Sequence, residues 1–285
     1  MNFLAAGGVK YSSRIARAEL LKSRYPFASE ILDFYLHIAK FQRELHEILP
    51  KRWGKRPVVP ADGNLRSELN LSMLLPSFGQ FLSVIESRGP APLAAKAKTM
   101  RSAGESAWTS TLEQFWESGI QELPQSDDTA AIRQTDPLQE FLGRAFLQPY
   151  AEFVAAAMLP PYSPMTVCRC PRCNSLPLLG VLRQEGDGGK RFLQCALCSQ
   201  EWGFLRILCA HCGEDREEKL PVYTAEQFPH VRMETCDTCK HFLRTIDLTK
   251  EGNAVPMVDD LATIPLTLWA KERGYQRIQD NLLGT

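Results

Sequence analysis

The sequence predicts an α+β protein with an N-terminal all-α domain, two tandem rubredoxin-like or zinc-ribbon modules and a C-terminal helix. Two observations support this fold class. About the first 160 residues show the apolar spacing of amphipathic helices, and all nine cysteines lie between Cys168 and Cys239. A chain of 285 residues is long enough for more than one domain. We expect four parts, at residues 1–160, 161–204, 205–250 and 251–285.

The strongest helical pattern runs from Ser29 to Leu49, with Ser29 as the expected N-cap and Pro50 as the expected end. A further helix is expected from Asp136 to Leu159, with Asp136 as its N-cap and a kink at Pro149. The apolar face of this helix predicts core packing by Leu138, Phe141, Leu142, Phe146 and Phe153. Shorter helices are predicted at 13–24, 65–75, 78–86, 92–102 and 106–117.

The stretch "LPPYSPMT", residues 159–166, is rich in proline and indicates a domain boundary. Beyond it, short β-type stretches such as "LLGVLR" and "FLRILC" alternate with cysteine pairs. Helical spacing returns from Val258 to Tyr275.

The composition excludes several classes of protein. The formal net charge is zero, which argues against nucleic acid as the main partner. No apolar run approaches the roughly 20 residues that span a bilayer, so we expect no membrane insertion. The first residues make a poor signal peptide and no Arg-Arg pair occurs, so the expected location is the cytoplasm. Thiols stay reduced there, and clustered Cys-x-x-Cys pairs more often hold metal than form disulfides.

The cysteines form four Cys-x-x-Cys pairs, with 21 residues between the first two pairs and 23 between the last two. This is one unit used twice, and each unit has the spacing of a four-thiolate metal ribbon. The predicted ligands of the first ion are Cys170, Cys173, Cys195 and Cys198, and those of the second are Cys209, Cys212, Cys236 and Cys239. A cross-braced arrangement would join alternate pairs, but sequential pairing closes shorter loops and is favoured.

A tight turn in each pair aims both sulfurs at one ion, and the residue after the second cysteine often needs a positive φ. Asn174 and Gly213 suit this demand, whereas Ser199 and Lys240 suit it less well. We therefore expect one well-formed and one looser turn in each unit.

Four thiolates with no open position indicate a structural or electron-transfer ion rather than hydrolytic catalysis. Spacing does not separate zinc from iron, and zinc is the commoner ion in such sites. Cys168 is left over, either as a spare thiol near the first site or as a substitute ligand or reactive thiol. His211 and His241 match no ligand pattern and are expected at the surface.

The series "CPRCNSLPLLGVLR", "RFLQCALCSQEW", "LRILCAHCG" and "ETCDTCKHFLRTIDL", followed by "VDDLATIPLTLWAKERGYQR", resembles the formate dehydrogenase accessory protein family, FdhE. The resemblance covers about residues 165–280 and departs from the family at the additional Cys168 and at Asn174, where glycine is commoner. It implies a cytoplasmic, non-enzymatic maturation factor that binds the catalytic subunit of respiratory formate dehydrogenase before export. It also implies rubredoxin-like sites on the eight paired cysteines, with iron as the expected ion in both and zinc as the alternative.

Two other functions stay open at this point. A zinc-ribbon nucleic-acid module is disfavoured, because residues 167–248 hold eleven basic and eleven acidic residues and so lack a basic surplus. A rubredoxin-like electron carrier is compatible with iron. Asp259 and Asp260 suit the N-terminus of a helix, with contact to a client protein as the alternative. A homodimer is possible.

Overall fold

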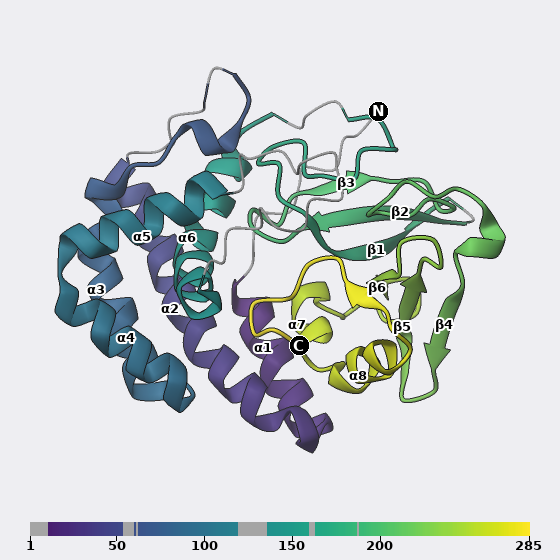
Figure 1. The fold of residues 1–285 in the computed structure, drawn as a ribbon, viewed down its shortest axis with the longest axis horizontal. Coiled ribbons are helices and arrows are strands. Elements are labelled where there is room, and N and C mark those ends of the chain that lie inside the picture. Colours follow the sequence, from purple (N-terminus) through teal and green to yellow (C-terminus); the bar gives the residue numbers. More distant parts are fainter. Residues whose placement is uncertain (1–10, 54–59, 61, 119–135, 160–162, 187) are drawn as a thin grey trace.

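The computed structural model describes residues 11–53, 60, 62–118, 136–159, 163–186 and 188–285. Figure 1 shows a helical half on one side and a β-sheet on the other, with α1 (Tyr11–Arg24) and α7 (Pro256–Leu261) between them. This is the expected α+β class: a helical N-terminal region followed by a sheet-containing region with two four-cysteine clusters.

The helical half contains α1, α2 (Ser29–Trp53), α3 (Leu71–Arg88), α4 (Ala91–Ala103), α5 (Glu105–Ser118) and α6 (Pro137–Ala157), with short 3₁₀ turns at Pro26–Ala28 and Leu65–Ser67. Helix α6 is its centre, because every residue from Leu142 to Ala155 is buried. The side chain of Asp136 caps α6 by accepting the backbone N–H of Leu138 at 2.9 Å, as predicted. The predicted core role of the α6 apolar face is also confirmed.

Three helix boundaries differ from the prediction. Pro50 lies inside α2 rather than ending it, because Trp53 in the next turn packs on Tyr150 with ring centroids 5.4 Å apart. Ser29 has helical dihedrals and follows directly from the 3₁₀ turn, so it is not an N-cap. The helices expected at 65–75 and 78–86 are instead a 3₁₀ turn and the single helix α3, which continues through Pro76. Tertiary packing outweighs the local cost of proline in both long helices.

The sheet contains β1 (Pro177–Glu185), β2 (Gly188–Cys195), β3 (Glu201–Gly203), β4 (Val222–Ala225), β5 (Phe228–Thr235), β6 (His241–Asp247) and β7 (Gln276–Arg277), with a 3₁₀ turn at Glu217–Lys219. Its order is β3-β2-β1-β6-β5-β4, and β7 pairs with β6. All neighbours are antiparallel except β1 with β6 and β6 with β7. The β1–β6 pairing joins the strands of the two cysteine units into one sheet.

The expected C-terminal helix is two short helices, α7 and α8 (Ile264–Glu272), followed by β7. One cluster of buried apolar residues extends from the helical half into the sheet and these helices. The division of the chain at residues 1–160, 161–204, 205–250 and 251–285 stays a proposal. None of the described helices is long and apolar enough to cross a membrane.

Candidate metal centres

The structure brings the eight paired cysteines into two clusters with the sequential grouping. In the first, sulfur separations are 3.3 Å for Cys173 and Cys195, and 3.6 Å for Cys170 and Cys198. In the second, sulfur separations are 3.7 Å for Cys212 and Cys236, and 3.8 Å for Cys209 and Cys239. Four sulfurs around a tetrahedral ion with bonds of about 2.3 Å lie roughly 3.8 Å apart. No disulfide forms among these residues, and the donor set fits zinc or iron in both clusters.

The four Cys-x-x-Cys turns have the same backbone. In each, the N–H of the first cysteine donates to the carbonyl oxygen five residues later, at 2.8 to 2.9 Å. The residue after the second cysteine has a positive φ in all four turns: 58° at Asn174, 55° at Ser199, 75° at Gly213 and 56° at Lys240. The expectation of one looser turn in each unit was therefore wrong. Sequence preference at one position does not override a geometry that the whole turn imposes.

Those three non-glycine residues are the only ones with positive φ among the described residues. A left-handed conformation costs an L-residue roughly 1–2 kcal/mol, so the fold keeps it where the sulfurs need it. Backbone N–H groups also point at sulfur: Leu197 and Cys198 donate to the Cys195 sulfur at 3.3 and 3.4 Å. His211 donates to the Cys209 sulfur at 3.4 Å. Such bonds stabilise thiolate charge.

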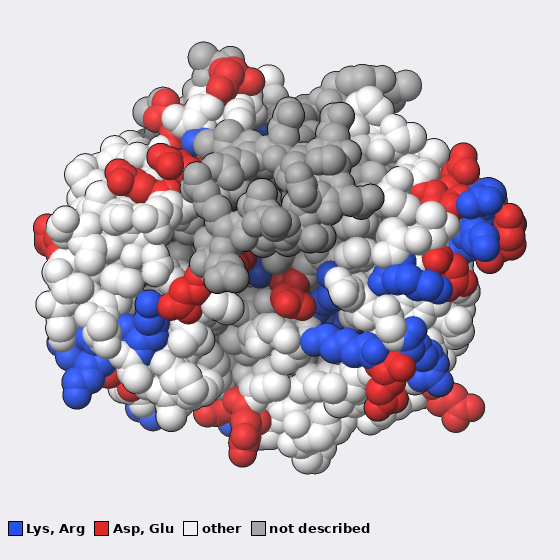
Figure 2. Space-filling model, viewed as in Figure 1, with Lys and Arg blue, Asp and Glu red and all other residues white. Residues whose placement is uncertain are grey.

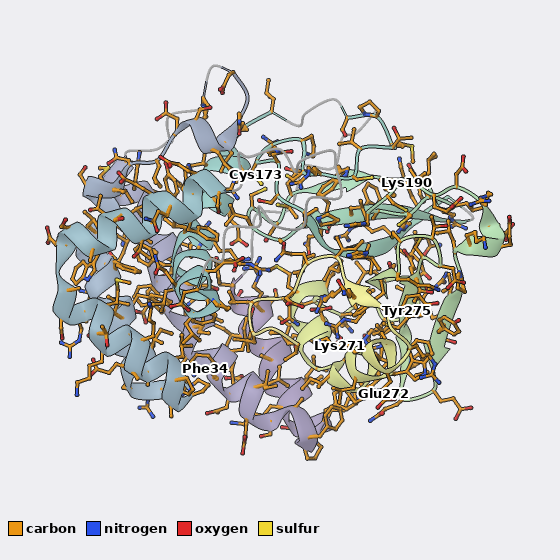
Figure 3. The ribbon with its side chains drawn as sticks, viewed as in Figure 1. Phe34, Cys173, Lys190, Lys271, Glu272 and Tyr275 are labelled. Carbon is orange, nitrogen blue, oxygen red and sulfur yellow. The ribbon has the colours of Figure 1, made fainter. Side chains whose placement is uncertain are left out.

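The first cluster is buried under the helical half. All four of its cysteines are buried, and Figure 3 shows Cys173 where the helices meet the sheet. Arg66, in the 3₁₀ turn, donates to the Cys173 carbonyl at 2.8 Å and to the Ser175 hydroxyl at 2.9 Å. Arg172, inside the first turn, reaches back to the carbonyl oxygens of Met158 and Leu159 after α6.

A buried ion pair in the helical half holds the other turn of the first cluster. Glu152 of α6 pairs with Arg14 of α1 at 2.7 Å, and its side chain is fully buried. The hydroxyl of Ser199 donates to Glu152 at 2.5 Å. Ser199 follows Cys198 directly, so the ion pair fixes the residue with the left-handed backbone. No sequence motif marks this contact, although a glutamate on the buried face of a helix is a usable signal.

The second cluster is more open to solvent. Cys212 is exposed and Cys239 is half-buried. His211 is exposed, as expected, whereas His241 is half-buried. Their rings stack with centroids 3.7 Å apart and an angle of 11°. The two rings lie near Cys239, but parallel stacked rings cannot both direct a lone pair at one ion, so we assign no ion to them.

Cys168 lies two residues before Cys170 of the first cluster and also contacts the second cluster. Its sulfur is 3.8 Å from the carbonyl oxygen of Cys209. Burial and the nearby Cys209 raise the pKa of Cys168, which keeps it a neutral thiol. This agrees with a spare thiol and not with a reactive thiolate.

Burial and hydrogen bonds between thiols shift the pKa values of cysteines in the same cluster in different directions. Burial would raise the pKa of Cys173, but hydrogen bonds from the other three thiols and the charge of Arg66 hold it well below its usual range. The hydrogen bond from Cys239 lowers the pKa of Cys209 to about 4, and burial raises that of Cys212 to about 11. Cysteine binds zinc or iron as the thiolate, so binding of an ion to either cluster releases protons.

Asp259 and Asp260 are buried and do not reach a partner surface. Asp259 lies in the first turn of α7, as expected, but it accepts two bonds from Arg17 of α1, at 2.9 and 2.6 Å, and contacts His230. Asp260 pairs with the buried Arg244 and Arg277. Both aspartates hold the C-terminal region in the interior, which excludes client contact in this conformation.

Comparisons with known proteins agree with this architecture. Residues 169–206 match the model of the FdhE central domain, and residues 207–283 match that of the FdhE C-terminal domain. A protein FdhE homolog of Aquifex aeolicus is 25% identical over 282 residues, 94% of this chain and 93% of that one. One from Pseudomonas aeruginosa is 37% identical over 119 residues, 40% of this chain and 38% of the relative.

The fold is that of a solved structure. The crystal structure of the FdhE protein from Pseudomonas aeruginosa superposes with a TM-score of 0.70 and 22% identity, over 96% of this chain and 95% of that one. The two domain models, the relatives and the shared fold all indicate similarity to FdhE proteins. Residues 169–283 therefore match the FdhE central and C-terminal domains, and the whole chain has the fold of an FdhE protein.

Proposed function

We propose that this protein is a cytoplasmic accessory protein for the maturation of respiratory formate dehydrogenase. It binds the catalytic subunit before export and catalyses no reaction itself. The observation that carries the proposal is the combination of both FdhE domains with two intact four-cysteine clusters. Two closed thiolate sites suit a scaffold for a partner protein better than a hydrolytic centre.

We propose further that the eight paired cysteines each bind metal, one ion per cluster, and that the ion is iron. The ligands are Cys170, Cys173, Cys195 and Cys198 for the first ion, and Cys209, Cys212, Cys236 and Cys239 for the second. Anaerobic purification with metal analysis tests this assignment. About two equivalents of iron and a visible thiolate-to-iron absorption support it; a colourless protein with two zinc ions contradicts the choice of iron.

A protein partner is preferred to nucleic acid. On the described part of the face in Figure 2, basic and acidic side chains are interspersed. A nucleic-acid-binding surface is expected to show a basic stripe instead.

Co-purification tests the partner. Tagged protein is expressed with the formate dehydrogenase catalytic subunit, and the subunit is expected to elute with it. The matched control is an unrelated exported subunit of similar size. Failure to retain the catalytic subunit over this control, with both clusters loaded, contradicts the proposal.

The exposed second cluster favours one alternative, a rubredoxin-like electron carrier. Exposure of Cys212 places one sulfur of this cluster at the surface, where electrons could pass to a partner. Iron that cycles reversibly between two oxidation states in the purified protein is required for this role, and a zinc protein excludes it.

A further inference from the structure

A polar cleft with a volume of about 350 Å³ opens where the two cysteine units meet in the sheet. Its floor is Leu182 of β1, and its polar lining includes Gln184, Arg206, Arg232, Asp247 and Thr249. Leu182 and Asp247 are direct partners in the parallel β1–β6 pairing. The cleft therefore exists only when the two units are paired, and it lies within the usual size range of small-molecule sites.

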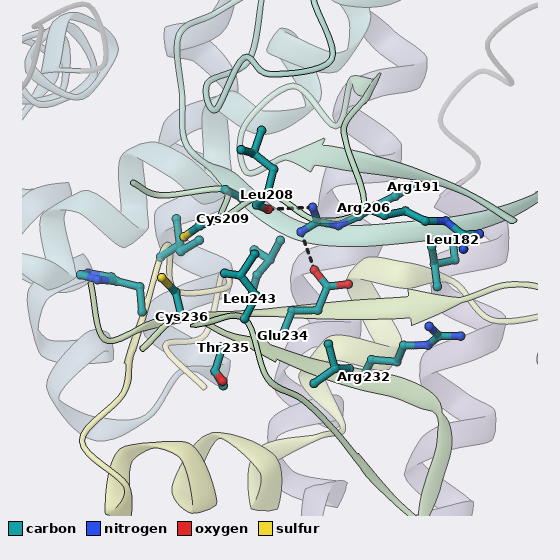
Figure 4. Close-up of a pocket in the computed structure, with 15 residues that line it drawn as sticks. Leu182, Arg191, Arg206, Leu208, Cys209, Arg232, Glu234, Thr235, Cys236 and Leu243 are labelled. Atoms are coloured by element: carbon teal, nitrogen blue, oxygen red, sulfur yellow. Dashed lines mark hydrogen bonds and ion pairs between the residues drawn. The ribbon is translucent and has the colours of Figure 1, made fainter. Parts of the chain in front are cut away.

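Two guanidinium groups dominate the cleft. Figure 4 shows Arg206 and Arg232 extending along opposite sides of Leu182, with their charged ends on the same side of it. Each donates a single hydrogen bond among the described residues, Arg206 to the Gly189 carbonyl and Arg232 to Asp247 at 2.6 Å. A guanidinium carries five N–H groups in a fixed fork, so most of these donors have no acceptor among the residues that the structure describes.

Asp247 orients Arg232 rather than occupying the cleft. One of its oxygens accepts Arg232, and the other accepts the backbone N–H and the hydroxyl of Thr249 at 3.1 and 2.5 Å. Burial would raise the pKa of Asp247, but the hydrogen bonds from Thr249 and Arg232 outweigh it and keep the pKa low. The side chain is 1% exposed. Among the described lining residues, the cleft has two cations and this one anion.

Arg191 fixes the segment that carries Arg206. It is 4% exposed and donates to the carbonyl oxygens of Leu205 and Leu208, at 2.7 and 3.1 Å, on either side of Arg206. It also pairs with Glu234, so its own charge is balanced, as the dashed lines in Figure 4 show. A narrower pocket of about 130 Å³ shares Arg206 and Arg232 and leads inward to Cys209 and Cys236.

We propose that this cleft binds the oxyanion group, phosphate or carboxylate, of a small molecule. Arg206 and Arg232 supply charge-assisted hydrogen bonds from two sides, and Gln184 supplies an amide donor. The ligand would lie across the junction of the two units and beside the second cluster. Its binding would stabilise the pairing of β1 with β6.

Isothermal titration of the metal-loaded protein with inorganic phosphate, and separately with succinate, tests this site. We expect at least one of the two to bind with a Kd of about 1 mM or tighter, and the comparison tells phosphate from carboxylate. Arg206→Gln and Arg232→Gln should each weaken that binding at least about tenfold. The affinity of Arg206→Lys should lie between those of the wild-type protein and Arg206→Gln, because lysine keeps the positive charge but lacks the forked guanidinium donors.

The matched control is Arg183→Gln, which also removes one positive charge. Arg183 belongs to β1, is 47% exposed in its side chain, and pairs with Glu201 away from the cleft. It should change affinity by less than about twofold. Absence of binding of both probes by the wild-type protein, or equal weakening by Arg183→Gln, overturns the proposal. Near-UV circular dichroism and metal content confirm that each variant is folded and loaded, and neither outcome depends on the formate dehydrogenase partner.

Discussion

The two four-cysteine clusters share one backbone design and differ in their surroundings. All four cysteines of the first are buried. The helical half contacts its turns through Arg66 and Glu152, and Arg172 of the first turn donates to the Met158 carbonyl after α6. The second has an exposed cysteine, Cys212, and no described residue of the helical half donates a hydrogen bond to its turns. The same repeat therefore occurs in two environments. The first cluster is buried where the helices meet the sheet, and the second is the one that solvent can reach.

Loss of the first cluster should have the largest effect. Cys173→Ser removes a proposed ligand with 0% exposure from the junction of helices and sheet. A structural ion contributes about 10–16 kcal/mol in small zinc peptides, comparable to the whole stability of a domain. We expect loss of near-UV circular dichroism and of cooperative melting in this variant, including the helices, because the core is shared.

The matched variant is Cys212→Ser in the second cluster. It should lose one equivalent of metal, keep the other and still melt cooperatively at a lower temperature. The comparison fails if Cys212→Ser unfolds the protein while Cys173→Ser leaves it folded.

The two clusters should release metal to a chelator at different rates. A strong chelator is expected to take one equivalent at least about tenfold faster than the other, because release from the buried cluster requires local opening. A chromophoric chelator followed over time measures both phases. Cys212→Ser should abolish the fast phase and leave the slow phase in place; a single phase for the wild-type protein would show that burial does not distinguish the clusters.

The buried ion pair over the first cluster tests how the helical half contributes. Glu152→Gln leaves Arg14 buried without its charge partner and should cost about 3 kcal/mol of unfolding free energy. It should also speed release of the slow metal equivalent and leave the fast one unchanged. Chemical denaturation and the chelator assay measure the two effects.

Asp33→Asn is the control, since its partner Lys22 lies at the surface and the Asp33 side chain is 50% exposed. Its effect should stay below about 0.5 kcal/mol. Similar losses for both variants would rule out a special role for the buried pair.

The sequence predicted the features that depend on local spacing. The sequential grouping of the eight paired cysteines and the helices α1, α4, α5 and α6 follow from short-range periodicity and from loop closure. The wrong predictions concern helix boundaries that depend on contacts with residues distant in the sequence. Pro50 and Pro76 lie inside helices because of packing partners far along the chain. Residues 65–67 form a short turn that contacts Arg172 instead of a long helix.

The asymmetry of the clusters could not be predicted for the same reason. Arg66 meets Ser175 across 109 residues, and Glu152 meets Ser199 across 47, so both contacts exist only in the folded molecule. Nothing in the repeat itself distinguishes a buried cluster from an exposed one. The buried charges Asp259 and Asp260 likewise read as a helix start, since their arginine partners belong to other elements.

The smallest expected change in unfolding free energy comes from substituting the residue with positive φ in each turn of the first cluster. Ser199 and Asn174 both belong to the first cluster and have φ of 55° and 58°. Ser199→Ala should cost about 1–2 kcal/mol, because it removes the hydroxyl that donates to the buried Glu152. Ser199→Gly loses the same hydroxyl but relieves the strained backbone, so it should be less harmful by up to about 1 kcal/mol.

Asn174 separates the two contributions, because no described hydrogen bond involves its side chain. Asn174→Gly should change the unfolding free energy by less than about 0.5 kcal/mol, while Asn174→Ala should destabilise through the backbone alone. Denaturation of the four variants at equal metal content gives the comparison. If alanine and glycine are equivalent at both positions, the left-handed turn is not strained, and the difference between the clusters rests entirely on burial and on the contacts with the helical half.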